Sequence, residues 1–246
     1  MTPSLLSDPV LAGAAALVAV SAGLLTTVAG IGGGQVLLIA LALLTDPVTA
    51  LTVTGPALLL GNGHRLFVMR RSIPWRTIAP FLLGALPGAI FGGVLAAFIP
   101  EQGLRLVMVG MAVLAGIKVL AGWSWTPPPS ALTPGGAFTG VLAATGGGAG
   151  LIAGPLLLSS GLTGRAYVSG IATASVTMHL GRMAAYGASG WVSSGTFVAG
   201  GLLAGAIVLG NLIGLRARDH VPQHWEPRLE VGAVGVCIAM AFANAA

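Results

Sequence analysis

The stretch GIGGGQ, residues 30–35, decides how this chain is interpreted, because it interrupts a long apolar run with three consecutive glycines. Each glycine inside a helix is destabilising by about 1 kcal/mol relative to alanine. A second stretch, ATGGGA at residues 144–149, repeats the pattern in the other half of the chain. The sequence therefore predicts two helix breaks of the same kind.

The composition around these breaks is that of an integral membrane protein. Of the 246 residues, 55% are hydrophobic and 7% are charged, whereas soluble domains carry about 25% charged residues. The mean hydropathy is +0.94. Apolar runs of about 20 residues cross a bilayer as helices, so we expect an all-α polytopic bundle. The predicted segments are 10–29, 48–69, 77–99, 103–121, 163–187, 195–215 and 229–245, with a broken segment at 134–160.

The remaining composition excludes several classes of protein. The net charge is +5, but the basic residues lie mostly in short loops, where they orient a membrane protein, so we expect no nucleic-acid partner. The single cysteine, Cys237, allows neither an intrachain disulfide nor a thiolate cluster. The four histidines and six carboxylates form no recognisable catalytic set. We expect no enzymatic activity, no cofactor and no metal site.

Four short matches recur in the same order about 115 residues apart, which indicates an internal duplication. They are the two glycine triplets, His64 with His179, Trp75 with Trp191, and Gly88-Ala89-Ile90 with Gly205-Ala206-Ile207. We therefore predict a first transmembrane repeat at 1–121 and a second at 131–246. A Pro-rich linker at 122–130 joins them, and its three successive prolines cannot continue a helix.

The positions of Lys and Arg favour inverted halves. If all eight segments crossed the membrane, these residues would divide almost evenly between its two sides. If each Gly-broken segment re-enters on its own side, all but Arg105 and Arg182 fall on one side, as the positive-inside rule requires. We therefore expect an inverted repeat, typical of secondary transporters. It would lie in the inner or plasma membrane, with the basic loops at 70–76 and 216–228 in the cytoplasm.

The glycine breaks themselves predict a binding site for an anion. A broken helix in hydrocarbon is tolerated only where protein or a water-filled cavity covers its backbone polar groups. If a new helix starts after each triplet, its first N–H groups and its positive dipole end bind anions. Glycine also lets a ligand approach the backbone closely. The predicted substrate-binding residues of the breaks are Gly32, Gly33, Gly34, Gln35, Thr145, Gly146, Gly147 and Gly148.

Close helix packing is the alternative interpretation of these glycines. It is the preferred interpretation for two sets spaced four residues apart, which are Gly84, Gly88 and Gly92, and Gly201 and Gly205. Packing requires one glycine per turn and not three in a row. A functional break is therefore favoured at the triplets.

Three stretches resemble the TauE/SafE-like sulfite exporter family, also described as 4-toluene sulfonate uptake permeases. They are GIGGGQVLLIALAL (30–43), ATGGGAGLIAGPLLL (144–158) and GRAYVSGIATASVTMHLGRMAAYGASGW (164–191). The resemblance covers nearly the whole chain and implies a permease for a small sulfur-containing oxyanion such as sulfite, thiosulfate or an organosulfonate. In one departure, the proline that usually follows the motif is present as Pro155 but is replaced by Ala40 in the first half.

Polar residues within the apolar segments complete the predicted site. An ionisable residue costs about 2.5–3.5 kcal/mol near a helix centre and is a functional candidate. The carboxylates all fall at segment ends or in loops, which favours an anion over a cation as substrate. The basic candidates, which either line the anion path or anchor the helices at the interface, are His64, Arg65, His179 and Arg182. The histidines can also take up a proton near neutral pH. Polar neighbours that either coordinate the anion or hydrogen-bond between helices are Asn62, Thr52, Thr54, Thr173, Ser175 and Thr177.

Two other functions stay open from the sequence alone. One is a passive channel or facilitator for small anions, since no coupling-ion site is evident. The other is a membrane-embedded enzyme or scaffold. The expected partners are a small anionic substrate and the lipid bilayer, and neither the direction of transport nor the oligomeric state follows from the residues.

Overall fold

The computed structural model describes residues 3–29, 32–121, 126–147 and 149–218, together with positions 232, 235 and 239. Gly148 and Cys237 lie outside the described residues, as does the predicted last segment at 229–245 apart from those three positions. Within the described ranges the chain is helical and has no strand, which confirms the all-α prediction. The helices are α1 (Pro3–Ser7), α2 (Pro9–Ala29), α3 (Gly33–Leu44), α4 (Pro47–Val68), η1 (Arg70–Ser72), α5 (Trp75–Phe98), α6 (Glu101–Leu120), η2 (Pro129–Ala131), α7 (Leu132–Thr145), α8 (Gly150–Ser159), α9 (Gly164–Ala188) and α10 (Ser194–Arg218).

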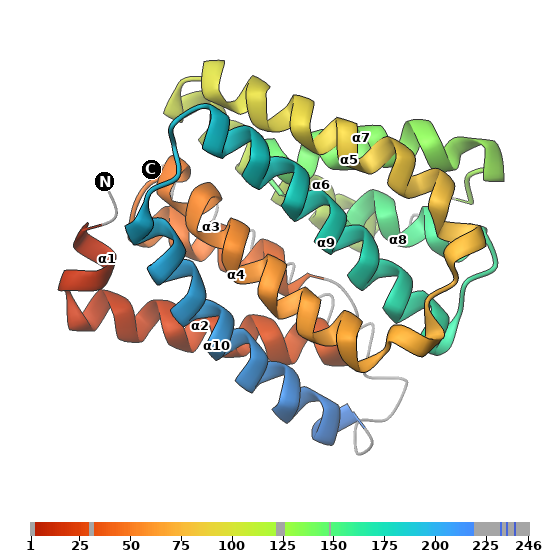
Figure 1. Ribbon diagram of the computed structural model, residues 1–246, viewed down its shortest axis with the longest axis horizontal. Helices are drawn as coiled ribbons and strands as arrows, with labels where there is room; N and C mark the ends of the chain where they lie inside the picture. Colours follow the sequence, from red (N-terminus) through yellow and green to blue (C-terminus); the bar gives the residue numbers. More distant parts are fainter. Residues whose placement is uncertain are drawn as a thin grey trace.

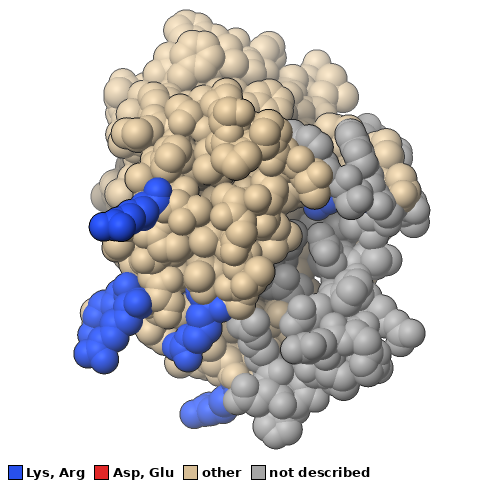
Figure 2. Space-filling model, turned by 90° about the vertical axis from the view of Figure 1, so that its right-hand side faces the viewer, with Lys and Arg blue, Asp and Glu red and all other residues tan. Residues whose placement is uncertain are grey.

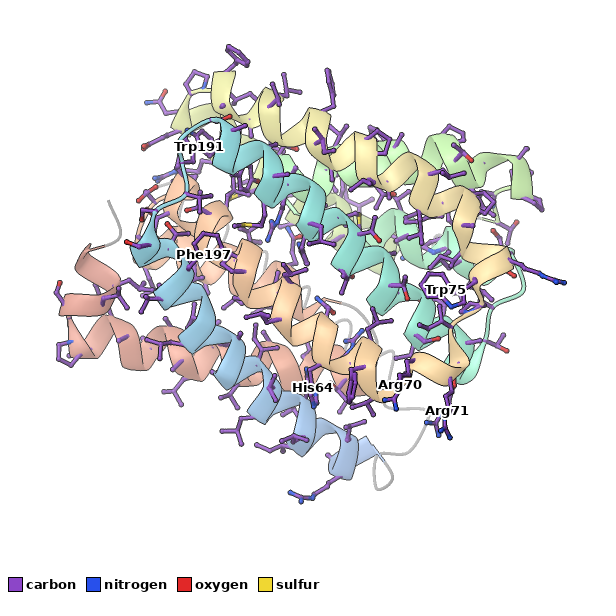
Figure 3. The ribbon with its side chains drawn as sticks, viewed as in Figure 1. His64, Arg70, Arg71, Trp75, Trp191 and Phe197 are labelled. Atoms are coloured by element: carbon purple, nitrogen blue, oxygen red, sulfur yellow. The ribbon has the colours of Figure 1, made fainter. Side chains whose placement is uncertain are left out.

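The two halves of the chain interleave instead of forming separate bundles. Helix α5 of the first half packs on α7 and α9 of the second, and α10 of the second half packs on α2 and α4 of the first. Helices α4 and α9 contact each other between these groups and run in opposite directions (Figure 1). Trp75, which begins α5, and Trp191, which precedes α10, lie at opposite ends of the bundle (Figure 3). This arrangement supports an inverted repeat, which stays a prediction.

Three of the described helices meet the length and hydropathy expected of a membrane span: α2 over Pro9–Val28, α5 over Trp75–Phe98 and α10 over Ser194–Ala217. Each has a mean hydropathy of 2.0 and exposes part of its apolar surface. Helices α4 and α9 are as long but carry more hydroxyl and basic residues, many of them buried. Several of their polar groups hydrogen-bond to protein, among them Thr54, Thr173 and Arg182.

The contact between α5 and α7 depends on glycine. A Cβ atom at Gly84, Gly88 or Gly92 of α5 would meet the backbone of α7, and one at Gly136 or Gly140 of α7 would meet the backbone of α5. The packing interpretation of Gly84, Gly88 and Gly92 is therefore confirmed. It is wrong for Gly201 and Gly205, where no described atom lies within 4 Å of the Cβ position. On α10, Gly200 and Gly210 instead approach the backbones of α4 and α2.

The described carboxylates and most of the exposed arginines lie at or near the ends of the helices. The Asp46 carboxylate accepts a hydrogen bond from the Thr49 N–H at 2.8 Å and caps α4, and Glu101 begins α6. Both positions place a negative charge at a positive helix end. Exposed basic residues gather where α4 and α10 end and α5 and α9 begin, and they are Arg70, Arg71, Arg76, Arg165 and Arg216. Figure 2 shows Lys and Arg on this side of the molecule with no Asp or Glu in view.

The helix starts give a different offset between the two halves from the one that the glycine triplets indicate. The starts of α3 and α8 lie as far apart in sequence as the starts of α4 and α9, and this distance is slightly longer than that between the triplets. In this register Arg65 aligns with Arg182, and Asn62, not His64, aligns with His179. The triplets therefore occupy different positions relative to the helices that follow them.

Candidate anion-binding site

The first break lies between α2 and α3. Gly32 adopts a φ of 99°, a left-handed conformation that favours glycine, and α3 begins at the next residue. A Cβ at Gly33 would overlap the Ala22 carbonyl oxygen and the Thr26 hydroxyl of α2. Helix geometry leaves the N–H groups of Gly33 and Gly34 without an acceptor inside α3. A new helix does start at this break, but it begins inside the triplet at Gly33 and not after the triplet, where the sequence predicted it.

The second break lies between α7 and α8. Gly146 follows the last residue of α7, and Gly147 adopts a φ of 80°. Helix α8 begins at Gly150. A Cβ at Gly146 would lie 2.5 Å from Val107 Cγ1 of α6, so this break is packed against protein. Thr145 is buried, and its hydroxyl donates a hydrogen bond to the Val141 carbonyl at 2.9 Å, which uses its proton within α7.

The two breaks meet inside the molecule. The Cβ position of Gly147, in the second break, lies 2.5 Å from Gln35 Oε1 and 2.8 Å from Leu38 Cδ2 of α3. The Gln35 side chain, one turn into the helix that follows the first break, therefore rests against the left-handed glycine of the second. The structure thus brings together residues that are more than a hundred positions apart in the chain.

Arg182 and His179 of α9 lie beside the second break. The exposed fractions of their side chains are 2% and 8%. Arg182 Nη1 donates to the Ala143 carbonyl and Nη2 to Thr54 Oγ1 of α4, both at 3.2 Å. Arg182 Nε and His179 Nδ1 are buried and have no hydrogen-bond partner among the described residues. Polar hydrogens thus remain available around this break.

The matching residues of α4 are spread along that helix. Arg65 is 3% exposed, and its Nη1 donates to the Thr26 carbonyl of α2 at 3.1 Å. Asn62 is buried, and its Nδ2 donates to the Leu58 carbonyl of its own helix at 2.9 Å. His64 is half-buried and lies towards the end of the bundle that carries Arg70 and Arg71 (Figure 3). Of these three residues, Arg65 is the one that hydrogen-bonds to the end of α2, next to the first break.

Two residues that make polar contacts near the breaks, Tyr186 and Asn211, were not singled out from the sequence. Tyr186 donates its hydroxyl hydrogen to the Ala144 carbonyl and stacks on Trp191 with ring centroids 5.5 Å apart. Asn211 of α10 accepts from Thr27 Oγ1 at 2.9 Å and donates to the Gly61 carbonyl at 3.1 Å. A signal existed for Tyr186, which lies four residues after Arg182 and so on the same helix face. Asn211 had none, because both of its partners are distant in sequence.

Apolar helices interrupted by interior breaks are typical of secondary transporters, and the structure has two such breaks beside buried arginines. The family model described as sulfite exporter TauE/SafE matches residues 15–243 of the 246. The chain therefore belongs to the sulfite exporter TauE/SafE family, and it is a membrane transporter of the anion-exporter type and not an enzyme. No curated protein and no solved structure gave a match.

Proposed function

We propose that this transporter carries a small sulfur-containing oxyanion, such as sulfite, thiosulfate or an organosulfonate, and binds it where the two glycine-rich breaks meet. The observation that carries the proposal is the contact of Gln35 with Gly147, because it joins the first turn of α3 to the break between α7 and α8. The basic end of the bundle is proposed to face the cytoplasm.

The chemistry of the meeting point suits an anion. The helices α3 and α8 direct their first N–H groups and positive dipole ends to the breaks. Buried Arg65 and Arg182 add positive charge behind them. The described carboxylates, at Asp8, Asp46 and Glu101, all lie at helix starts and away from the breaks. A cation would have no comparable set of oxygen ligands here.

The binding step is tested with purified protein in detergent. We expect thiosulfate, sulfite and sulfonates to raise the thermal unfolding temperature by several degrees, since a ligand at about 100 times its dissociation constant stabilises by about 2.7 kcal/mol. Acetate and chloride at equal ionic strength are the controls. Stabilisation by carboxylates alone would reject the sulfur-oxyanion assignment.

A passive facilitator for small anions is the second candidate, because an anion site between the two breaks would serve a channel as well as a coupled carrier. Uptake into proteoliposomes with a pH or sodium gradient distinguishes a coupled carrier from a passive facilitator. We expect radiolabelled thiosulfate to accumulate above its external concentration. Equilibration without accumulation under each gradient would show a facilitator in place of a coupled carrier.

A further inference from the structure

We propose that Arg65 and Arg182 are a symmetry-related pair of positioning residues, which cap the helix that ends at each break and do not themselves bind the anion. Each arginine lies on the second long helix of its half, and each uses Nη1 to reach a backbone carbonyl 39 residues earlier. The two hydrogen bonds measure 3.1 and 3.2 Å, and both side chains are almost completely buried.

The carbonyl groups that they reach are those that a helix leaves unpaired. The last four carbonyls of a helix have no intrahelical donor, and Thr26 and Ala143 carry such groups in α2 and α7. At the end of α7, the Leu142 carbonyl accepts from Gly146 and Gly147 N–H, and the Ala144 carbonyl accepts from Tyr186. Arg182 donates to the Ala143 carbonyl, which lies between these two. A guanidinium at this end also opposes the negative pole of the helix dipole.

Capping fixes the geometry of the break, because the helix end and the next helix start are in contact. Gly33 of α3 rests against the backbone and side chain of the last turns of α2, so a displaced α2 end displaces the start of α3. In the second half, Arg182 also donates to Thr54 of α4. The second break is therefore tied to the other half of the chain.

An effect of these arginines on transport rests on the proposed anion site, but their capping of the helix ends is testable without any anion. A direct ligand is the alternative role for Arg182, whose Nε has no described partner. Hydrogen exchange in anion-free protein separates the two roles. The reporter amides are those of Gln35 and Val36 in α3, bonded to the Gly32 carbonyl, and those of Ile152 and Ala153 in α8, bonded to the Ala149 carbonyl.

We expect Arg65→Gln to accelerate exchange at the α3 reporters by about tenfold and to leave the α8 reporters unchanged, since a charged hydrogen-bond donor is lost locally. Arg182→Gln gives the reverse pattern, so each variant is the control for the other. Unchanged exchange at both breaks, with loss of thiosulfate-induced protection, would show that the arginines are anion ligands. Equal acceleration at both breaks would show a global loss of stability and would also overturn the proposal.

Milder variants serve if the glutamine variants fail to fold. Arg65→Lys, which keeps one donor, is expected to restore protection at α3 and the thiosulfate concentration for half-maximal uptake. Arg182→Lys is expected to restore protection at the α8 reporters and the thiosulfate concentration for half-maximal uptake only in part, because one ammonium group cannot replace both guanidinium nitrogens that donate hydrogen bonds. Thr54→Val removes the acceptor of Arg182 Nη2 and is expected to accelerate the α8 reporters about threefold. Its matched control is Thr52→Val, whose hydroxyl bonds only within α4 in the described contacts.

Different results would reject the proposed oxyanion function and the proposed capping role of the arginines. If the unmodified protein neither binds nor transports sulfur oxyanions while the exchange pattern holds, the proposed function is rejected and the capping role stands. If transport is intact and Arg182→Lys matches the unmodified protein in both exchange and half-saturation, the positioning role is rejected and the proposed function stands.

Discussion

Replacing Gly147 with alanine is expected to lower oxyanion uptake by at least about tenfold, because displacing groups of a binding site by about 1 Å is enough for such losses. The residue has a φ of 80° and its Cβ position lies 2.5 Å from Gln35 Oε1. A methyl group therefore strains the backbone and separates the two breaks. Uptake of thiosulfate into proteoliposomes measures the effect.

Gly161 offers a matched control for this substitution. Its φ of 83° is nearly the same, but no described atom lies within 4 Å of its Cβ position. Gly161→Ala should cost about 1–2 kcal/mol from the left-handed conformation alone and should retain transport. Equal loss of transport in both variants would show that backbone strain, and not the contact between breaks, causes the effect.

A double substitution tests the contact itself. If Gln35 and the new methyl group collide, Gln35→Ala should relieve part of the stability lost in Gly147→Ala, with a coupling energy of about 0.5–3 kcal/mol. Additive thermal unfolding data for the two changes would contradict the contact. The double variant is not expected to recover transport, because Gln35 is a proposed anion donor.

Replacing Gly88 with alanine is expected to destabilise the protein by at least about 3 kcal/mol, the upper end of the cost of overpacking. The added Cβ would lie 2.8 Å from Ala137 Cα and would overlap its carbonyl oxygen. Both belong to the backbone of α7, which cannot move aside by a rotamer change. Thermal unfolding of the purified protein in detergent measures the loss.

The control for Gly88 is a helical glycine with room for a methyl group. Gly110 of α6 has no described atom within 4 Å of its Cβ position. Gly110→Ala should therefore leave stability unchanged or raise it by up to about 1 kcal/mol through helix propensity. A similar loss in both variants would contradict a close contact between α5 and α7.

Local chemistry made much of the fold predictable. Runs of apolar residues gave the positions of α2, α5 and α10, and the glycine triplets gave the two helix breaks. The carboxylates of Asp46 and Glu101 were expected at segment ends, where the structure has them. Spacing of four residues also predicted that Gly84, Gly88 and Gly92 pack closely, because one glycine per turn forms a single smooth helix face.

The same spacing wrongly predicted close helix packing at Gly201 and Gly205, because a smooth helix face does not determine which element lies opposite it. The offset between the halves also differs with the features aligned, because identical residues and the starts of corresponding helices are not the same distance apart. Arg65 and Arg182 were singled out as costly buried charges, but their common partners, the carbonyl ends of α2 and α7, could not be inferred. Those partners depend on which helix the chain brings alongside.

The sequence by itself determined that the chain is a helical membrane protein with two helix breaks, since hydrophobic length and glycine conformation act within a few residues. Only the tertiary structure decided that Gln35 meets Gly147, that each buried arginine donates to a carbonyl near the end of a helix that precedes a break, and that α5 and α10 pack across the halves. These features join residues far apart in sequence, and their geometry follows from how helices pack, which no local pattern encodes.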